Sequence, residues 1–378
     1  MSMYTILIAG DICPIGNNEP LFRAGDASGL FNDLVREMEA ADLRIANLEC
    51  PLIDRESPIP KTGPSFGAAP ECIRGIKAAG MDVLCLANNH IMDHGPAGLT
   101  NTMEVCRAER ILTIGAGGNL VEARKIVIAK VGAVRVGLLA MAEHEFSIAG
   151  KDSPGANPLD LIDFVRNVRD QRSEFDYLIV LVHGSNEFFV PTPRIKETCH
   201  FMVEMGANAV IVQHPHVLGG YEDYRGGHIV YGQGAFVMDE EIYRGSPSFH
   251  EGFLVKLLVD DSARSQMQIV PFEQSNPGPG ARRLSVEREH ELLARLEARS
   301  RVIQNDEFVE AEWLKYCREN KYGYLNTLLG FGRVTRRLNR PGWLTRLLYT
   351  RRALLGLRNC VCCETHHEAL QTILDELV

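Results

Sequence analysis

The chain alternates between short apolar runs typical of strands and amphipathic segments typical of helices through residue 272. Residues 4–9 form an apolar, β-branched run that stops at Gly10-Asp11, and residues 43–48 form a second run that stops at Glu49. Between them, residues 29–40 repeat apolar side chains at the spacing of one helix face. Alternation of this kind predicts a largely parallel sheet covered by helices, with antiparallel strands added late in the domain.

The same alternation continues along the chain. Further strands are expected at residues 82–87, 125–130, 134–141, 177–182, 209–212, 228–232, 234–238, 252–259 and 266–272, and further helices at about 70–79, 96–108, 159–172 and 193–205. The stretch Asn276-Pro277-Gly278-Pro279-Gly280 is typical of a linker, and the residues after it have helical patterns only. We therefore predict an α/β domain over residues 1–275 and an all-helical C-terminal region over residues 281–378.

Composition places the chain among ordinary soluble globular proteins, because 45% of its 378 residues are hydrophobic and 24% are charged. Its N-terminal apolar run is about six residues long, which is too short for the core of a signal peptide. No run reaches the roughly 20 apolar residues that a membrane-spanning helix needs. Ten cysteines without framework spacing indicate reduced thiols. These features predict a cytoplasmic protein.

The formal charge of −9 conceals a strong asymmetry. No acidic residue lies between Glu319 and Glu364, while nine of the 40 basic residues do, which leaves 31 basic residues against 49 acidic ones elsewhere. Residues 323–358, called here the basic segment, combine eight arginines with Leu, Phe and Trp. One interpretation is a peripheral contact with the anionic inner membrane. In the other, the leucines pack on the main domain and the arginines pair with its acidic surface. No recognised nucleic-acid-binding fold accompanies the charge, so nucleic acid is not expected as a partner.

Polar side chains follow five of the predicted strands. They are Asp11, Glu49, Asn89-His90, His183 and His214-Pro215-His216. Any one of them alone would be an ordinary turn or cap residue. Ligands of open α/β sheets bind at the carboxyl ends of the strands, so these side chains are expected to converge. Carboxylate, amide and imidazole groups suit a divalent ion such as Mn, Zn, Fe or Mg.

Several motifs together resemble the CapA family of capsule and poly-γ-glutamate biosynthesis proteins. The resemblance covers residues 4–272 and is most specific in the Asn-Asn-His-x-x-Asp-x-Gly block. Its motifs are Gly10-Asp11, Ala46-Asn47-Leu48-Glu49-x-Pro51-Leu52, Lys61 with Phe66, Ala87-Asn88-Asn89-His90-x-x-Asp93-x-Gly95, His183-x-x-x-Glu187-Phe188 and His214-Pro215-His216-Val217-Leu218. The family is similar to calcineurin-like metallophosphoesterases, and the resemblance implies their layered αββα domain with two metal ions at strand ends.

The resemblance also implies roles for individual residues. Asp11 and His216 would hold one metal, Glu49 would bridge, and Asn89, His183 and His214 would hold the other. His90 would protonate the leaving oxygen, and Asp93 would orient His90. Glu187 would be a further ligand or an acceptor behind the ligands.

The sequence departs from the phosphoesterase pattern at several positions. Asp11-Ile12-Cys13 replaces Asp-x-His, so either Cys13 is a soft ligand or the first metal is weakly held or missing. Glu49 stands where ordinary phosphoesterases have a bridging Asp. Gly184-Ser185 follows the central His in place of Trp and Gly, and Ala235 stands where the family has Asn. These changes favour metal binding over turnover.

Two functions are compatible with these motifs. The first is a metal-dependent phosphoester hydrolase acting in capsule, exopolysaccharide or poly-γ-glutamate biosynthesis on a phosphorylated or polyanionic substrate, together with polymer-synthesis proteins. The alternative is a non-catalytic, metal-containing subunit of a polymer synthesis or export complex at the inner membrane. A catalytic protein needs His90 and both metals, whereas an assembly subunit needs neither.

Overall fold

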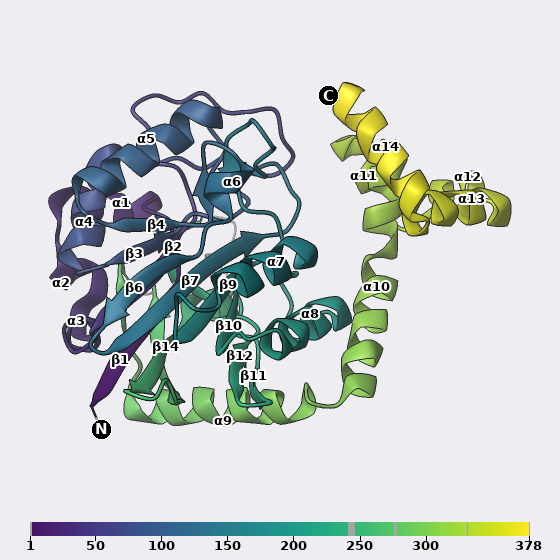
Figure 1. The fold of residues 1–378 in the computed structure, drawn as a ribbon. Helices are drawn as coiled ribbons and strands as arrows, with labels where there is room; N and C mark the ends of the chain where they lie inside the picture. The colour runs from purple at the N-terminus through teal and green to yellow at the C-terminus, as the bar shows by residue number, and fades with distance from the viewer. Residues whose placement is uncertain (1, 241–245, 276–277, 331, 378) are drawn as a thin grey trace. The chain divides into compact units, whose positions relative to one another are not determined.

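The computed structural model describes residues 2–240, 246–275, 278–330 and 332–377 (Figure 1). The chain forms two compact units, Met1–Glu310 and Ala311–Val378. Residues 281–310, which the sequence pattern grouped with the C-terminal region, therefore belong to the first unit. Part of the reason is a short strand, β16 (Ala281–Arg283), which pairs with β15 (Ser265–Gln274).

The first sheet of the first unit has the order β16-β15-β14-β1-β2-β3-β4, and β13 also pairs with β1. β1 to β4 and β13 run parallel, whereas β14, β15 and β16 are antiparallel additions. Asp11 lies opposite Asn47 in the register of β1 and β2, so the carboxyl ends of both strands reach the same edge. The bounds are β1 Met3–Ile12, β2 Leu43–Leu48, β3 Val83–Cys85, β4 Leu112–Ile114, β13 Ala235–Val237 and β14 Glu251–Asp260.

The second sheet has the order β11-β12-β10-β9-β7-β6. β7, β9, β10 and β12 are parallel, and Gln213 lies opposite His183 at the carboxyl ends of β10 and β9. The hairpin predicted around Gly132 is present, with φ of 57° at that glycine. The bounds are β6 Val127–Val131, β7 Val134–Ala142, β9 Tyr177–His183, β10 Ala209–Gln213, β11 Tyr221–Tyr224 and β12 Gly227–Val230, and the short β5 (Ala116–Gly117) pairs with β8 (Gly155–Ala156).

Successive apolar side chains along the central strands point to opposite faces of the sheet, and this alternation produces the layers. In β9, Ile179 and Leu181 join the core shared with the first sheet, while Val180 and Val182 join a second core beneath two helices. Those helices are α7 (Leu161–Gln171) and α8 (Pro193–Glu204) (Figure 1). The expected αββα layers are therefore present, and the expected all-helical region is found in the second unit.

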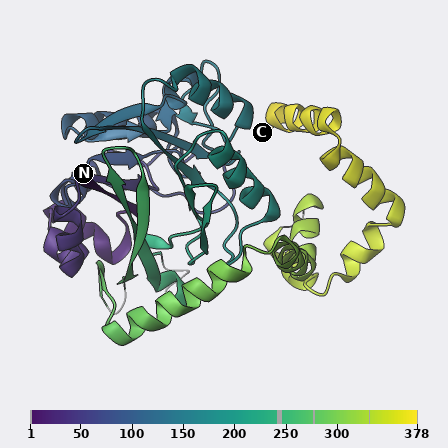
Figure 2. The ribbon, with the colours of Figure 1, turned by 60° about the horizontal axis from the view of Figure 1, so that its bottom comes forward.

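Other helices cover the first sheet, and α9 (Val286–Val302) contacts β15 (Figure 2). The helix expected over residues 29–40 is interrupted at Asn32, which has a φ of 44° and ends α2. The remaining bounds are α1 Glu19–Ala24, α2 Ala27–Phe31, α3 Val35–Glu39, α4 Ile73–Ala78, α5 Gly95–Ala108 and α6 Leu120–Ala123, with 3-10 turns at Gly16–Asn18, Asn32–Leu34, Pro70–Cys72 and Pro247–His250.

The second unit is helical throughout its described part. A buried polar cluster joins its first three helices, because the Asn339 side-chain amide donates to Asn326 Oδ1 (2.9 Å) and to Thr345 Oγ1 (2.6 Å). No described helix combines the length and hydrophobicity needed to span a membrane. The helices are α10 Asp306–Leu328, which begins in the first unit, α11 Arg333–Leu338, α12 Trp343–Leu348, α13 Arg351–Cys362 and α14 Glu364–Leu377.

Candidate metal centre

The six side chains proposed as metal ligands meet at one edge of the two sheets. Three come from the first sheet and three from the second, and all lie at or just after the carboxyl ends of strands. They are Asp11 of β1, Glu49 after β2, Asn89 after β3, His183 of β9, and His214 and His216 after β10. The convergence expected from parallel strands is therefore present.

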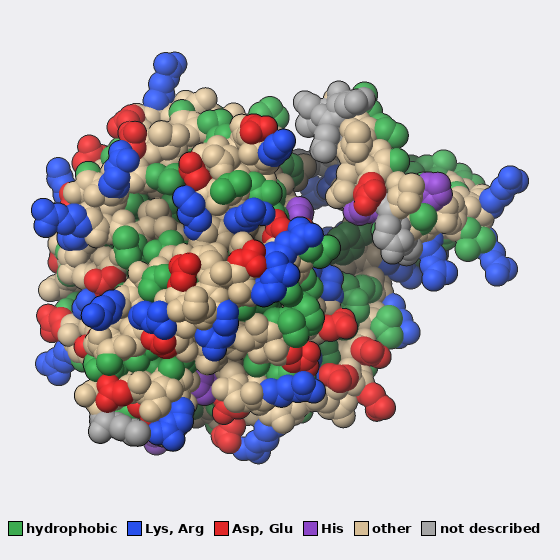
Figure 3. Space-filling model, in the orientation of Figure 1, with side chains coloured by type: hydrophobic (Ala, Val, Ile, Leu, Met, Phe, Trp, Pro, Cys, Tyr) green, Lys and Arg blue, Asp and Glu red, His purple; other side chains and the backbone are tan. Residues whose placement is uncertain are grey.

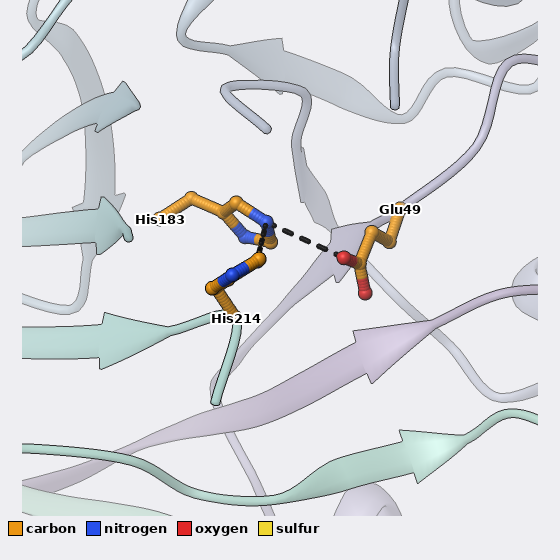
Figure 4. A group of neighbouring side chains, drawn as sticks. All are labelled: Glu49, His183 and His214. Carbon is orange, nitrogen blue, oxygen red and sulfur yellow. Dashed lines mark hydrogen bonds and ion pairs between the residues drawn. The ribbon is translucent and has the colours of Figure 1, made fainter. Parts of the chain in front are cut away.

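One group of donors surrounds Nε2 of His183 (Figure 4). This atom lies 3.2 Å from His214 Nδ1, 3.3 Å from Glu49 Oε1 and 3.0 Å from Asn89 Oδ1. His214 reaches this point with a φ of 95°, a strained value for a residue with a side chain. The four residues are those that the resemblance assigned to one metal together with its bridging carboxylate.

A second group lies on the other side of Glu49. His216 Nε2 is 3.1 Å from Glu49 Oε2 and 3.8 Å from Asp11 Oδ2. The two oxygens of Glu49 thus face different groups, which is the arrangement of a bridging ligand. Because Glu49 is fully buried, neither oxygen can be solvated in place of those contacts.

The charges of the two groups depend on one another. Burial would raise the pKa of Glu49, but the charge and hydrogen bond of His216, together with the nearby His183, hold it well below its usual value. Burial and the charge of Glu49 raise the pKa of Asp11 to about 6. Burial and the neighbouring His183 lower the pKa of His214 to about 3, which keeps that imidazole neutral and able to ligate.

Two asparagines that the sequence analysis left without a role support the Asp11 carboxylate and the strand end before Glu49. The Asn47 amide donates to Asp11 Oδ1 (2.7 Å) and lies 3.4 Å from His183 Nδ1. Asn88 donates in turn to Asn47 Oδ1 (3.0 Å) and to the Leu48 carbonyl (2.8 Å). Both asparagines lie inside motifs quoted in the sequence analysis. Their positions in those motifs were the signal that could have identified them.

Glu187 lies behind His216. Its Oε1 is 3.0 Å from His216 Nδ1, and its Oε2 accepts from the His216 backbone N–H at 2.8 Å. A carboxylate on the far nitrogen fixes the ring so that the other nitrogen points at a metal. Glu187 was expected to be either a further metal ligand or an acceptor behind the ligands, and these contacts favour the second role.

His90 and Asp93 lie beside the first group. Asp93 Oδ2 is 2.6 Å from His90 Nδ1 and also accepts from the Phe66 backbone N–H at 2.7 Å. Lys61 pairs with the other Asp93 oxygen and lies 3.4 Å from His90 Nδ1, and its side chain is only 3% exposed. The sequence analysis noted Lys61 by its motif but gave it no role.

A cavity of about 540 Å³ opens beside His90. It is lined by Lys61, Thr62, Gly63, Pro64, Asn89, His90, His144, Glu145 and Phe146. One predicted metal ligand, Asn89, and the predicted acid, His90, therefore face the same space. The loop His144-Glu145-Phe146 was missed because it follows β7 without a motif.

Cys13 takes no part in either donor group among the described residues. It is fully buried beside Cys50, and burial together with that thiol raises its pKa well above the usual value. Such a thiol is a poor ligand because the metal-binding form is the thiolate. Of the two alternatives for this position, the structure favours a weakly held or missing first metal, because the Asp11 and His216 group lacks the sulfur ligand.

The donors present fit a divalent ion. Within each group the ligand atoms lie within 4.8 Å of one another, and Glu49 Oε1 is buried without a hydrogen bond from a described residue. Two buried carboxylates facing two groups of imidazoles are unfavourable unless a cation or protons balance them. The geometry thus supports the binding of divalent metal at these residues.

Comparison with known proteins places these residues in a family context. The family described as "Bacterial capsule synthesis protein PGA_cap" matches residues 5–240, a range that holds all six proposed ligands. The chain is 27% identical over 303 residues to a capsule biosynthesis protein CapA of Bacillus anthracis, covering 77% of this chain and 73% of that protein. It is 28% identical over 215 residues to the PGA biosynthesis protein CapA of Bacillus subtilis (strain 168), covering 55% and 56%. A probable polyglutamine synthesis accessory protein of Mycobacterium tuberculosis is 30% identical over 259 residues, covering 64% and 68%.

Proposed function

The chain belongs to the PGA_cap family of bacterial capsule synthesis proteins, and we propose that it serves capsule, exopolysaccharide or poly-γ-glutamate biosynthesis as a metal-dependent phosphoester hydrolase. The role in polymer synthesis rests on the names of its relatives. The hydrolytic activity rests on one arrangement of side chains. Glu49 faces two donor groups, and His90, held by Asp93, shares a cavity with one of the ligands.

The chemistry divides between the metal ions and the chain. Divalent ions at the two groups would neutralise charge on a phosphoryl group and lower the pKa of a bound water. Asp93 occupies Nδ1 of His90, so Nε2 is the nitrogen left to donate a proton to a leaving oxygen in the cavity. Asn89, His183 and His214 would hold one ion, Asp11 and His216 would hold the other, and Glu49 would contribute to both.

The substrate is a phosphomonoester or phosphodiester of a polymer precursor. A site that balances two buried carboxylates with cations attracts anionic groups and disfavours neutral ones. The cavity of about 540 Å³ is large enough for a phosphorylated small molecule or the end of a chain. The exposed ring of Phe146 and the His144 imidazole line its outer part.

The first experiment measures metal and activity in the same preparation. Bound Mn, Zn, Fe and Mg are quantified by mass spectrometry, and rates are measured with p-nitrophenyl phosphate and bis-p-nitrophenyl phosphate after loading with Mn or Zn. We expect His90→Ala to retain its metal and to lose about 10²–10⁴-fold in kcat. His290→Ala, at an exposed position of α9, is the matched control and should behave as wild type.

The outcomes separate the two candidate functions. Equal rates for wild type and His90→Ala would remove His90 from the mechanism. Retained metal with no turnover of either substrate would favour the non-catalytic subunit, for which the absence of Cys13 from the Asp11 and His216 group is the supporting observation. Purified wild-type protein that binds no divalent ion would contradict both.

A further inference from the structure

The second unit has a positively charged surface that the proposed function does not use. The basic segment contains eight arginines and no acidic residue. Arg346 donates to the Tyr322 hydroxyl at 2.7 Å. Within the described part of the chain, five others form no ion pair: Arg337, Arg340, Arg351, Arg352 and Arg358. Their charge is therefore available to an anionic partner.

Large apolar side chains are exposed on the same segment (Figure 3). Trp343 and Leu347 of α12 are 59% and 70% exposed. Each lies two residues, or about 200° of helical turn, from the buried Thr345, which hydrogen-bonds with Asn326. Because Thr345 faces the unit's own polar cluster, Trp343 and Leu347 must face away from it.

α13 also carries large apolar side chains, of which Leu354 and Val361 are 40% and 52% exposed. Leu354, Leu357 and Val361 follow the i, i+3, i+7 spacing of one helix face, and Arg351 and Arg358 lie along the edge of that face. The apolar side chains of α12 and α13 belong to two separate helices, because Thr350 accepts from the Ala353 backbone N–H at 3.2 Å and begins a new helix. Leu355 consequently lies on the polar side of α13.

We propose that the basic segment is a peripheral membrane-binding surface whose partner is an anionic lipid bilayer. Apolar side chains would enter the boundary between head groups and acyl chains, and the arginines beside them would reach the lipid phosphates. A soluble polyanion would satisfy the arginines but leave Trp343 and Leu347 in water. An uncharged apolar partner would leave the arginines unpaired. This inference does not depend on the hydrolytic activity.

The experiment uses the full chain and the only two tryptophans it contains. Trp313→Phe leaves Trp343 as the sole tryptophan reporter, and an aromatic ring still stacks on Tyr316. This protein is mixed with vesicles of phosphatidylcholine alone or with one third phosphatidylglycerol, and binding is measured by sedimentation and tryptophan emission. We expect binding to the anionic vesicles only, with a blue shift of Trp343 emission that 0.5 M salt weakens.

Substitutions separate the charge from the apolar contact. Removing three charges by Arg351→Gln, Arg352→Gln and Arg358→Gln should lower the partition coefficient roughly a hundredfold, at about fivefold per charge. Leu347→Ser should reduce both binding and the blue shift. The matched controls are Arg107→Gln, an exposed arginine of the first unit, and Leu314→Ser, an exposed leucine of α10, and both should bind as wild type. Circular dichroism checks that each variant keeps its helices.

Three results would overturn the proposal. The first is equal binding to neutral and anionic vesicles. The second is binding of soluble poly-γ-glutamate that depends on the arginines while vesicles cause no Trp343 shift, which would identify a polyanion site. The third is a lipid-free dimer that Leu347→Ser converts to monomer, which would identify the apolar face as an interface between copies.

Discussion

Lys61 shows how a single buried residue connects the cavity wall to the proposed acid. Its ammonium group is paired with Asp93, whose carboxyl also contacts His90, and both side chains are almost completely buried. The pair fixes the loop that carries Lys61 against the start of α5. A buried ion pair of this kind contributes through geometry, because breaking it leaves one charge unpaired.

We therefore expect Lys61→Met to destabilise the first unit by about 3 kcal/mol, because Lys61 is the one permanently charged partner of the Asp93 carboxylate among the described residues. The measurement is equilibrium unfolding in urea, followed by circular dichroism. Lys77→Met, which removes an exposed lysine, is the matched control and should cost less than 1 kcal/mol.

A double-mutant cycle tests the assigned cause. Adding Asp93→Asn to Lys61→Met removes the unpaired charge, so the double variant should be more stable than Lys61→Met alone. If the two substitutions were simply additive, the pairing seen between these side chains would contribute nothing. In that case the cost of Lys61→Met would come from packing against the Phe146 ring.

The candidate metal ligands could be predicted individually from the sequence, but the residues that orient those ligands could not. Asp11, Glu49 and His183 each lie at the end of a strand whose apolar pattern is visible in the sequence, so each could be placed at the carboxyl edge of a sheet. The contact of Glu187 with His216 joins two loops after neighbouring strands. Its orientation depends on backbone positions that no local pattern specifies.

At the level of elements, a hydrogen-bonded cluster joins the two sheets far from the candidate metal centre. The Tyr177 hydroxyl, at the start of β9, donates to Ser265 Oγ of β15 at 2.9 Å. His228 Nε2 of β12 lies 3.0 Å from the same oxygen, and its Nδ1 is 2.6 Å from Asp223. One serine thus connects the second sheet to the first.

We expect Tyr177→Phe to lower the free energy of unfolding by about 1 kcal/mol, because one hydrogen bond is lost while Ser265 keeps His228 as a partner. Ser265→Ala should cost more, about 2–3 kcal/mol, since it leaves both the buried Tyr177 hydroxyl and His228 Nε2 without that partner. Urea unfolding of both variants measures which substitution lowers the free energy of unfolding more. A Ser265→Ala cost no larger than that of Tyr177→Phe would show that the cluster does not hold the sheets together.

Strands were easier to predict than the breaks between elements. β2 has the expected bounds and β9 extends one residue beyond them, because buried parallel strands are continuous apolar runs. The helix expected over residues 29–40 is broken instead, because Asn32 donates its side-chain amide to the Ala281 carbonyl, 249 residues away in sequence. The same contact region contains β16, which is too short and polar to be recognised from its own residues.

At the scale of the molecule, the sequence predicted the alternation of strands and helices but only one sheet. The division into two sheets came from the resemblance, because a sequence pattern does not show which strands are neighbours. β1 and β14 are paired although they lie some 250 residues apart. The consequence for function is large, since each donor group combines ligands from both sheets.

Because each donor group draws its ligands from both sheets, a bound metal ion should stabilise the folded unit whether or not the protein is catalytic. An ion held by Glu49 and His183 would connect the first sheet to the second, so it would bind the folded unit and not the unfolded chain. At a free metal concentration a hundredfold above Kd, the folded state gains about 2.7 kcal/mol. For a unit of this size we expect the melting temperature to rise by roughly 5 °C after chelator-treated protein is supplied with Mn or Zn.

Glu49→Gln is the decisive variant, because Glu49 belongs to both donor groups whereas His214 and His216 belong to one each. It should abolish the metal-induced rise, while His214→Ala and His216→Ala should each reduce it. Glu71→Gln, at an exposed position, should leave it unchanged. Calorimetry resolves the first unit's transition from that of the helical second unit. A full rise in Glu49→Gln would mean that the stabilising ion binds elsewhere, and the bridging role of Glu49 would have to be abandoned even if activity were found.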